Sequence, residues 1–167
     1  MKVKWKTKTN KIPAIKTSLK GMNDRAVIVG ALEGDHKWLA GIHEYGCNIP
    51  VTPKMRAFLH SQGLHLKQST TVIKIPERSF LRATHDKEAD RILTQTERAI
   101  SLVLSGEMSV DDMIELYGQQ FVSAIKRYMR DLSEPENHPF TVDQKGSANP
   151  LVGTTGHLIE SITWKEE

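Results

Sequence analysis

Residues 109–132, SVDDMIELYGQQFVSAIKRYMRDL, decide how this sequence folds, because their apolar side chains recur every three or four positions. That spacing gathers them on one face of an α-helix, which then packs against a core. Ser109 stands before the apolar run and Asp112 follows three residues later, a pattern typical of a capped helix start. The apolar stripe of this predicted helix comprises Val110, Met113, Ile114, Tyr117, Phe121, Ala124, Ile125, Tyr128, Met129 and Leu132.

A second stripe with the same spacing precedes the first one along the chain. Most charged residues of this stretch fall off the stripe, and Ser105-Gly106 ends the predicted helix. The sequence therefore predicts two long helices in succession. The apolar positions of this earlier helix are Ala89, Ile92, Leu93, Thr96, Ile100, Val103 and Leu104.

Shorter segments on either side of the helices have the composition of strands. Residues 26–32 are rich in β-formers, and a turn at 33–35 leads to residues 38–45, which return as a second strand or a short helix. We interpret this pair as a hairpin. Residues 70–75 predict a strand ended by Pro76, and residues 158–164 predict the last strand.

These elements predict an α+β fold in which one small antiparallel β-sheet packs against two long α-helices. We expect a basic N-terminal arm over residues 1–20 and a single domain over residues 21–167. That domain carries a helical or irregular insert around residues 51–70 and a long loop over residues 133–150, which is rich in Pro, Asn and Gly.

Within the insert, residues 54–62 predict a short helix that starts after Pro53 and stops at Gly63. Residues 64–66 are expected to pair with the strand at 70–75.

Length and composition limit the class of protein. The chain has 167 residues, the size of one domain, and 38% of them are hydrophobic, a normal value for a globular protein. No apolar stretch approaches the roughly 20 residues that a membrane span requires. The first residues are basic without an apolar segment after them, and the single cysteine, Cys47, suits a reducing compartment. We therefore expect a soluble protein that is made inside the cell and has no membrane partner.

The net charge of +3 conceals an uneven distribution. Residues 1–20 contain seven lysines and no acid, so the other 147 residues carry 16 basic against 20 acidic side chains. Residues 2–9 alternate lysine with Val, Trp and Thr, a pattern that could form an edge strand. The arm is either a solvated tail or a contact for phosphate or an acidic protein. Candidate contacts for a partner or for DNA are Lys2, Lys4, Lys6, Lys8 and Arg82.

No motif in the sequence carries recognisable chemistry. The seven histidines form neither HxxxH nor HExxH, Cys47 lies in no activating signature, and no G-x-S-x-G is present. Residues 153–156, GTTG, could hold an anion through backbone N–H groups, but a turn before the last strand explains them better. The sequence predicts no catalytic residue, no metal and no cofactor.

Two segments, residues 75–82 and 39–46, carry charged residues in unusual positions. Residues 75–82, IPERSFLR, place two arginines at the start of a long helix, where the helix dipole does not need them. Arg78 and Arg82 are therefore expected to have a carboxylate partner, inside the fold or across an interface. Glu44, at the end of the apolar segment 39–46, is the candidate partner for Arg78; the alternative is two unrelated surface charges.

These two segments and a third one resemble the tail-completion or neck proteins of long-tailed bacteriophages, including the virion-morphogenesis proteins of Mu-like prophages. The family pattern has three parts, found here as AGIHEYG at 40–46, IPERSFL at 75–81 and PLVGTTGHLIESI at 150–162. The third part is one residue longer than usual before Thr-Gly, and Gly153-Thr154 replace the usual acid. The motif residues are Glu44, Tyr45, Gly46, Pro76, Arg78, Phe80, Leu81, Thr155, Gly156, Leu158 and Ser161.

The resemblance implies a structural virion protein without catalysis, assembled in the bacterial cytoplasm. Relatives sit between the head connector and the tail, usually as a ring of about six copies built from heterologous contacts. Implied partners are other copies of the chain, the head connector or stopper, and the tail tube or tail terminator, with a contact to DNA in the lumen. We expect the loop at 133–150 or the insert at 51–70 to dock on connector or tail, while the sheet builds the ring.

Three alternatives stay open. A tail terminator or a minor tail protein belongs to the same class, and the sequence does not separate them from a neck protein. A small nucleic-acid-binding protein with a basic arm would need aromatic residues among its basic ones, and only Trp5 lies among the lysines. A hydrolase using a metal would need a ligand set formed only by the tertiary structure.

Overall fold

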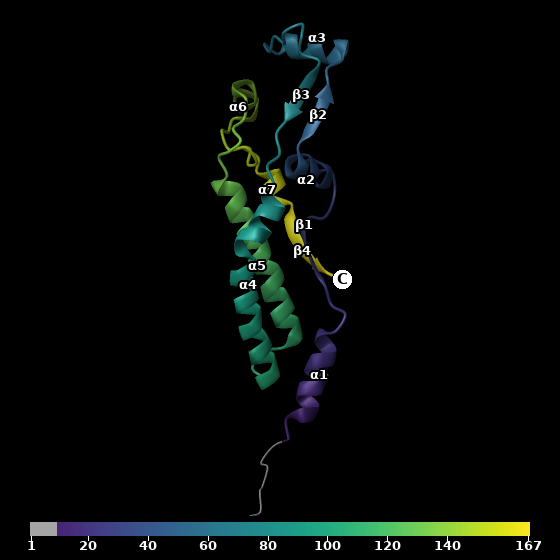
Figure 1. Ribbon diagram of the computed structural model, residues 1–167, viewed down its shortest axis with the longest axis vertical. Coiled ribbons are helices and arrows are strands. Elements are labelled where there is room, and N and C mark those ends of the chain that lie inside the picture. Colours follow the sequence, from purple (N-terminus) through teal and green to yellow (C-terminus); the bar gives the residue numbers. More distant parts are fainter. Residues whose placement is uncertain (1–9) are drawn as a thin grey trace, which may run out of the picture.

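The computed structural model of the protein describes residues 10–167 and shows an elongated molecule (Figure 1). Two long helices run beside a small sheet, and a second small sheet extends beyond the ends of both helices at one end of the molecule. The helices are α1 (Ile12–Met22), α2 (His36–Tyr45), α3 (Pro53–Ser61), α4 (Phe80–Ser105), α5 (Val110–Asp131), α6 (Pro139–Lys145) and α7 (His157–Glu160). The strands are β1 (Val27–Ala31), β2 (Cys47–Pro50), β3 (Val72–Ile75) and β4 (Ile162–Glu166).

The two long helices predicted from the apolar stripes are confirmed as α4 and α5, which form an antiparallel pair. Gly106 ends α4 with φ +82°, a conformation that glycine adopts without strain. Ser109 caps α5, since its Oγ accepts a hydrogen bond from the Asp112 N–H at 3.0 Å and the Asp112 carboxylate reaches back to the Ser109 N–H. The predicted capping box is therefore present.

The first sheet joins two ends of the chain. Strand β1 pairs antiparallel with β4, from Val27 opposite Glu166 to Ala31 opposite Ile162, and this pair packs on α5. Gly118 of α5 permits the close approach, because a Cβ at that position would lie 2.3 Å from the Trp164 ring. The predicted fold class, α+β with a small antiparallel sheet against two long helices, is confirmed.

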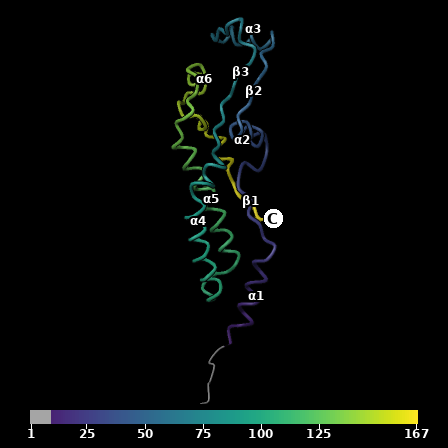
Figure 2. The backbone as a smooth tube through the Cα atoms, in the orientation of Figure 1, coloured from purple at the N-terminus to yellow at the C-terminus, as the bar shows by residue number. Residues whose placement is uncertain are grey.

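The second sheet is an addition to that prediction. Strand β2 pairs antiparallel with β3, from Cys47 opposite Ile75 to Pro50 opposite Val72, so the predicted pairing of residues 64–66 with this strand is wrong. Between them lies α3, the predicted short helix, whose start is capped by Thr52 accepting from the Met55 N–H at 3.1 Å. We call residues 47–75 the finger, because the tube trace shows that its tip, at α3, extends past the rest of the chain at this end of the molecule (Figure 2).

Three further predictions about local structure need correction. Residues 38–45 do not form a hairpin with 26–32; they lie in the helix α2, where Ala40 and Glu44 are four apart and are buried on one face. The loop at 133–150 contains the helix α6. Residues 157–160 form α7, so the last strand begins at Ile162 instead of Leu158.

The structure describes only the second half of the predicted basic arm, from residue 10 onward. Residues 12–20 belong to α1, whose first turn contains Pro13, and this helix contacts α4 and α5. The predicted edge strand over residues 2–9 lies outside the described residues, as do Lys2, Lys4, Lys6 and Lys8.

One hydrophobic core draws its residues from all three parts of the family-like pattern. Ala40 comes from the first part, Phe80 from the second and Leu158 from the third, and Phe80 has no exposed surface. The two helices and the sheet close around them. The other buried members are Ala31, Ile125, Met129, Leu151, Ile159 and Ile162.

Candidate functional site

The carboxylate of Glu44 is the most heavily bonded side chain where the first two motifs meet. It lies at the end of α2 with 3% of its surface exposed. It accepts hydrogen bonds from the Ser79 Oγ at 3.0 Å, the Leu81 N–H at 2.9 Å and the Arg82 N–H at 3.0 Å. Because the first N–H groups of a helix have no partner within it, Glu44 caps α4 from another element. Ser79, which directly precedes α4, donates to Glu44 and does not cap the helix with its own side chain.

Arg82 completes this cluster from its outer side. Its Nε donates to the Glu44 carboxylate at 3.0 Å, and its Nη2 donates to the Glu44 carbonyl at 2.8 Å and to Glu77 at 2.7 Å. The guanidinium also lies over the Tyr45 ring, 4.8 Å from its centroid. The hydrogen bond to Glu44, above all, raises the pKa of Arg82. The expected carboxylate partner inside the fold is confirmed for Arg82, but the pairing of Glu44 with Arg78 is wrong.

Gly46 holds the first motif against the second. Its φ of +67° suits glycine, and a Cβ there would lie 2.8 Å from the Ile75 carbonyl oxygen and 2.9 Å from the Glu77 nitrogen. Any side chain would push the two backbones apart. The motif glycine therefore serves a close approach between the end of α2 and the chain entering α4.

Arg78 is buried, with 5% of its surface exposed, and it binds backbone instead of a carboxylate. Its N–H donates to the His43 carbonyl at 2.7 Å, its Nε to the Pro135 carbonyl at 2.9 Å and its Nη2 to the Glu136 carbonyl at 3.0 Å. Burial lowers the pKa of this guanidinium. Arg78 thus fixes the segment after α5 to the junction of α2 and α4.

His43 is a neutral side chain beside two cations. Burial, and then the charges of Arg78 and Lys145, lower the pKa of His43 to about 4. Its Nδ1 is buried without a hydrogen-bond partner among the described residues. Lys145 donates to the carbonyls of Asn149 and Pro150, both at 2.9 Å, and burial lowers its pKa. The hydrogen bonds of Lys145 tie α6 to the start of the third motif.

The third motif forms a turn and a short helix. The Gly156 N–H donates to the Gly153 carbonyl at 3.1 Å, which closes the turn expected at residues 153–156, and Gly156 has φ +65°. Thr155 is exposed, while Leu158 is buried in the core. Ser161 donates from its Oγ to the Leu158 carbonyl at 2.8 Å. The motif therefore turns the chain into β4.

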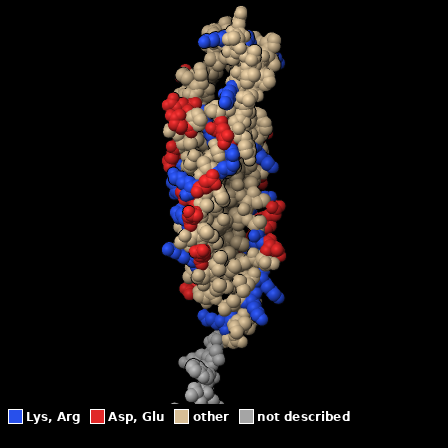
Figure 3. Space-filling view, in the orientation of Figure 1, with Lys and Arg blue, Asp and Glu red and all other residues tan. Residues whose placement is uncertain are grey.

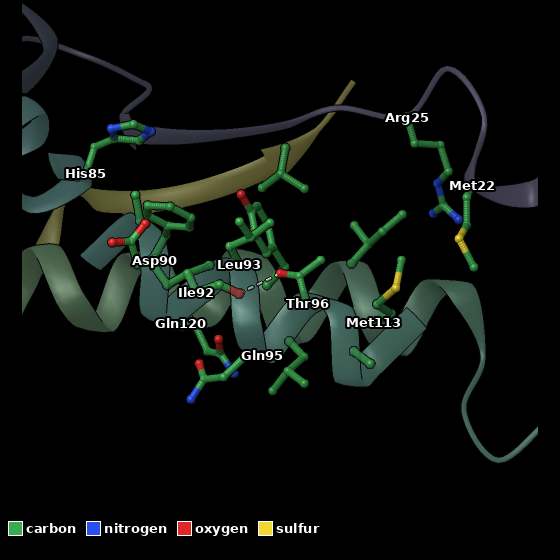
Figure 4. A pocket seen from close by; sticks show the side chains of 17 residues that line it. Met22, Arg25, His85, Asp90, Ile92, Leu93, Gln95, Thr96, Met113 and Gln120 are labelled. Carbon is green, nitrogen blue, oxygen red and sulfur yellow. Dashed lines mark hydrogen bonds between the residues drawn. The ribbon is translucent and has the colours of Figure 1, made fainter. Parts of the chain in front are cut away.

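A cleft of about 560 Å³ opens between α4, α5 and β1 (Figure 4). The Arg25 guanidinium at this cleft is engaged, since it pairs with Glu166 and, at 2.8 Å, with Asp111. The His85 ring stacks on Phe121 with centroids 6.4 Å apart. The walls are mostly apolar, among them Leu93, which is 60% exposed.

Metal ligands are not gathered in the described part of the chain. Residues 10–167 contain no group of three His, Cys, Asp or Glu side chains that could hold an ion. His60 and His65 face each other through their Nδ1 atoms at 2.6 Å, which the turn at Gly63 makes possible. Two ligands are fewer than a structural zinc site uses. Cys47 is half-buried in β2.

Exposed aromatic residues are the surface feature that the sequence reasoning missed. Trp38 is 72% exposed, Tyr45 68% and Phe58 61%, although such side chains are usually buried. Trp38 and Tyr45 both belong to α2, and Phe58 belongs to α3. The interpretation of residues 38–45 as part of a hairpin hides this feature. With the helical period of α2, Trp38 and Tyr45 are seven residues apart and fall on one face.

Comparison with protein-family models, with curated proteins and with solved structures finds no match for this chain. Of the helices within residues 10–167, none combines the length and the hydropathy that crossing a lipid bilayer demands.

Proposed function

We propose that the protein is a structural component of a phage or prophage virion that joins the head connector to the tail. The observation that carries this proposal is the meeting of all three family-like segments in one network. Glu44 caps the helix that follows the second segment, Gly46 allows the backbones to touch, and Leu158 of the third segment shares the core with Phe80. A pattern whose separate parts interlock in this way has the character of a fold signature and not of three chance matches.

The polar groups of the motifs support a role without catalysis. Glu44, Arg78 and Arg82 bond to other parts of the same chain, so none is left to act on a substrate. In this proposal the protein assembles in the bacterial cytoplasm as a ring of about six copies, which requires two different surface patches on each copy. Its partners are other copies, the head connector or stopper, and the tail tube or tail terminator.

The exposed aromatic side chains support contacts with other proteins. Trp38 and Tyr45 are exposed on α2, and this helix lies close to the base of the finger. The seven lysines of the N-terminal arm favour an additional contact with DNA in the lumen. A tail terminator or minor tail protein is the second candidate, because it would use the same fold and the same ring.

The proposal is tested by disrupting the gene in a bacterium that produces the particles and viewing the lysate by electron microscopy. Loss of a joining protein should leave filled heads and separate tails of normal length, and adding the purified chain should restore joined particles. Loss of a tail terminator would instead leave tails of irregular length. Joined, infective particles without the protein would refute both proposals.

A further inference from the structure

The finger, residues 47–75, is held to the molecule by little apolar burial. None of its described residues is buried, and its sheet has only the two strands β2 and β3. A two-stranded sheet alone is at most marginally stable in water, so three or more strands or packing against another surface are needed. Both outer edges of this sheet are unpaired within the described residues. The finger is therefore built to gain its burial from another molecule.

The charge of the finger indicates what kind of surface it fits. It contains Lys54, Arg56, Lys67 and Lys74 but no Asp or Glu. Arg56 is used internally, since it donates to the carbonyls of Leu66, Lys67 and Thr70 and so closes the loop before β3. The three lysines are exposed, and none forms an ion pair in the part of the chain that the structure describes. The finger presents an uncompensated positive surface.

An uncompensated negative surface lies on the same molecule. Asp131, Glu134, Glu136 and Asp143 are all exposed, and none of them is in an ion pair within residues 10–167. We call these four residues the acidic face. Asp131 ends α5, Glu134 and Glu136 lie in the segment after it, and Asp143 lies in α6. The space-filling view shows acidic atoms gathered at this end of the molecule (Figure 3).

The two surfaces lie at the same end of the molecule and belong to different segments, the finger and the stretch from the end of α5 to α6. In the ribbon view, α6 and the strands of the finger stand at the same level along the long axis, with α6 on the left and β2 on the right. In a ring whose axis is parallel to the long axis of the molecule, these two segments stand at the same level in every copy. The finger of one copy then lies beside the acidic face of the next copy. The surfaces that meet are different, as a closed ring requires.

We propose that the finger of one copy docks on the acidic face of the neighbouring copy, with Lys54, Lys67 and Lys74 opposite Asp131, Glu134, Glu136 and Asp143. This inference rests on the proposed function, because it names the contact that builds the ring. Phe58 and Val72, 61% and 46% exposed, supply the apolar part of the contact. The contact would bury side chains that a single copy leaves in water.

DNA is a poorer occupant for the finger than a second copy. Residues 77–167 carry 16 acidic against 10 basic side chains, and the acidic face stands at the same level as the finger. Phosphates that approach this end of the molecule would meet repulsion from those carboxylates. The acidic face of a neighbouring copy would instead be attracted to the finger, because its carboxylates would pair with the lysines of the finger.

Charge reversal tests the contact without touching the core. The finger variant carries K54E, K67E and K74E, and the face variant carries D131K, E134K, E136K and D143K. Each variant alone would oppose like charges and should associate at least tenfold more weakly than the native chain by light scattering at about 50 mM salt. A 1:1 mixture of the two variants should recover association, because each then meets an opposite surface.

A matched control reverses three other exposed lysines, Lys37, Lys87 and Lys165, to glutamate and should associate as the native chain does. Circular dichroism confirms that each variant is folded. Rings that persist in the finger variant would overturn the inference while leaving the proposed function intact. A native chain that stays monomeric at low salt would also overturn it, and the joining of heads to tails would then be judged by the gene-disruption experiment. Loss of DNA binding in place of self-association would assign the finger to nucleic acid.

Discussion

The carboxylate of Glu44 lies 3.0 Å from the Nε of Arg82 and also accepts the backbone N–H of that same residue. The two residues come from different motifs, one at the end of α2 and the other in the first turn of α4. Their contact sets the angle at which α2 meets the long helix pair. The finger begins three residues after Glu44, at Cys47, so this contact also positions the finger.

Replacing Glu44 by glutamine should lower the free energy of unfolding by about 3 kcal/mol, since it removes a buried charge that caps a helix and pairs with a cation. Urea denaturation measures the change. The control is Glu77→Gln, which removes the exposed partner of Arg82 and should cost less than about 1 kcal/mol. Equal effects of the two substitutions would show that the buried carboxylate has no special role.

Replacing Gly46 by alanine should destabilise the protein by about 3 kcal/mol, because the new Cβ would overlap backbone atoms 2.8 and 2.9 Å away. Gly63→Ala is the matched control: its φ is also positive, +89°, but no atom lies within 4 Å of the added Cβ. That substitution should cost about 1 kcal/mol. The difference between the two isolates the cost of the close approach.

His43 should make stability fall in mild acid. Its folded pKa of about 4 lies below its ordinary value of about 6.5, so the unfolded chain binds the proton first as the pH falls. The free energy of unfolding should therefore drop by about 2 kcal/mol between pH 6.5 and pH 4 from this residue, allowing for its partial exposure. His43→Gln should remove that part of the pH dependence. Parallel stability curves for the two proteins over this range would contradict the assignment.

Trp38→Ala should leave stability within about 0.5 kcal/mol, because the side chain is 72% exposed. If the outer face of α2 contacts a virion partner, the same variant should restore joined particles at least tenfold less well than the native chain when added to the lysate. Lys37→Ala, an exposed neighbour, should behave as the native chain. Full activity of Trp38→Ala would remove this face from the interface.

The long helices could be predicted from the sequence because their stripes of apolar residues run over four or more turns. The short helix α2 could not, since Trp38, Leu39, Ile42 and Tyr45 also suit a strand. What decides its structure is distant in the chain: the carboxylate of Glu44 needs the donors at the start of α4.

The pairing of the arginines shows the same limit. Arg78 and Arg82 stand four residues apart at one junction, and composition alone does not tell which one meets Glu44. Because α4 begins at Phe80, Arg82 lies in its first turn beside Glu44, while Arg78 precedes the helix and turns toward Pro135. The sequence predicts an insert around residues 51–70, in the region of the finger. It does not predict that the finger lacks buried residues, because burial depends on the position of the finger relative to the rest of the fold.

The measurement that tests the central claim most directly is the mass of the native chain in solution, by light scattering across a wide range of concentrations at physiological salt. The account predicts a closed ring of about six chains, close to 113 kDa for chains of 18.8 kDa. A compact dimer at every concentration, together with binding of that dimer to DNA, would contradict the account. It would assign the protein to the nucleic-acid-binding class.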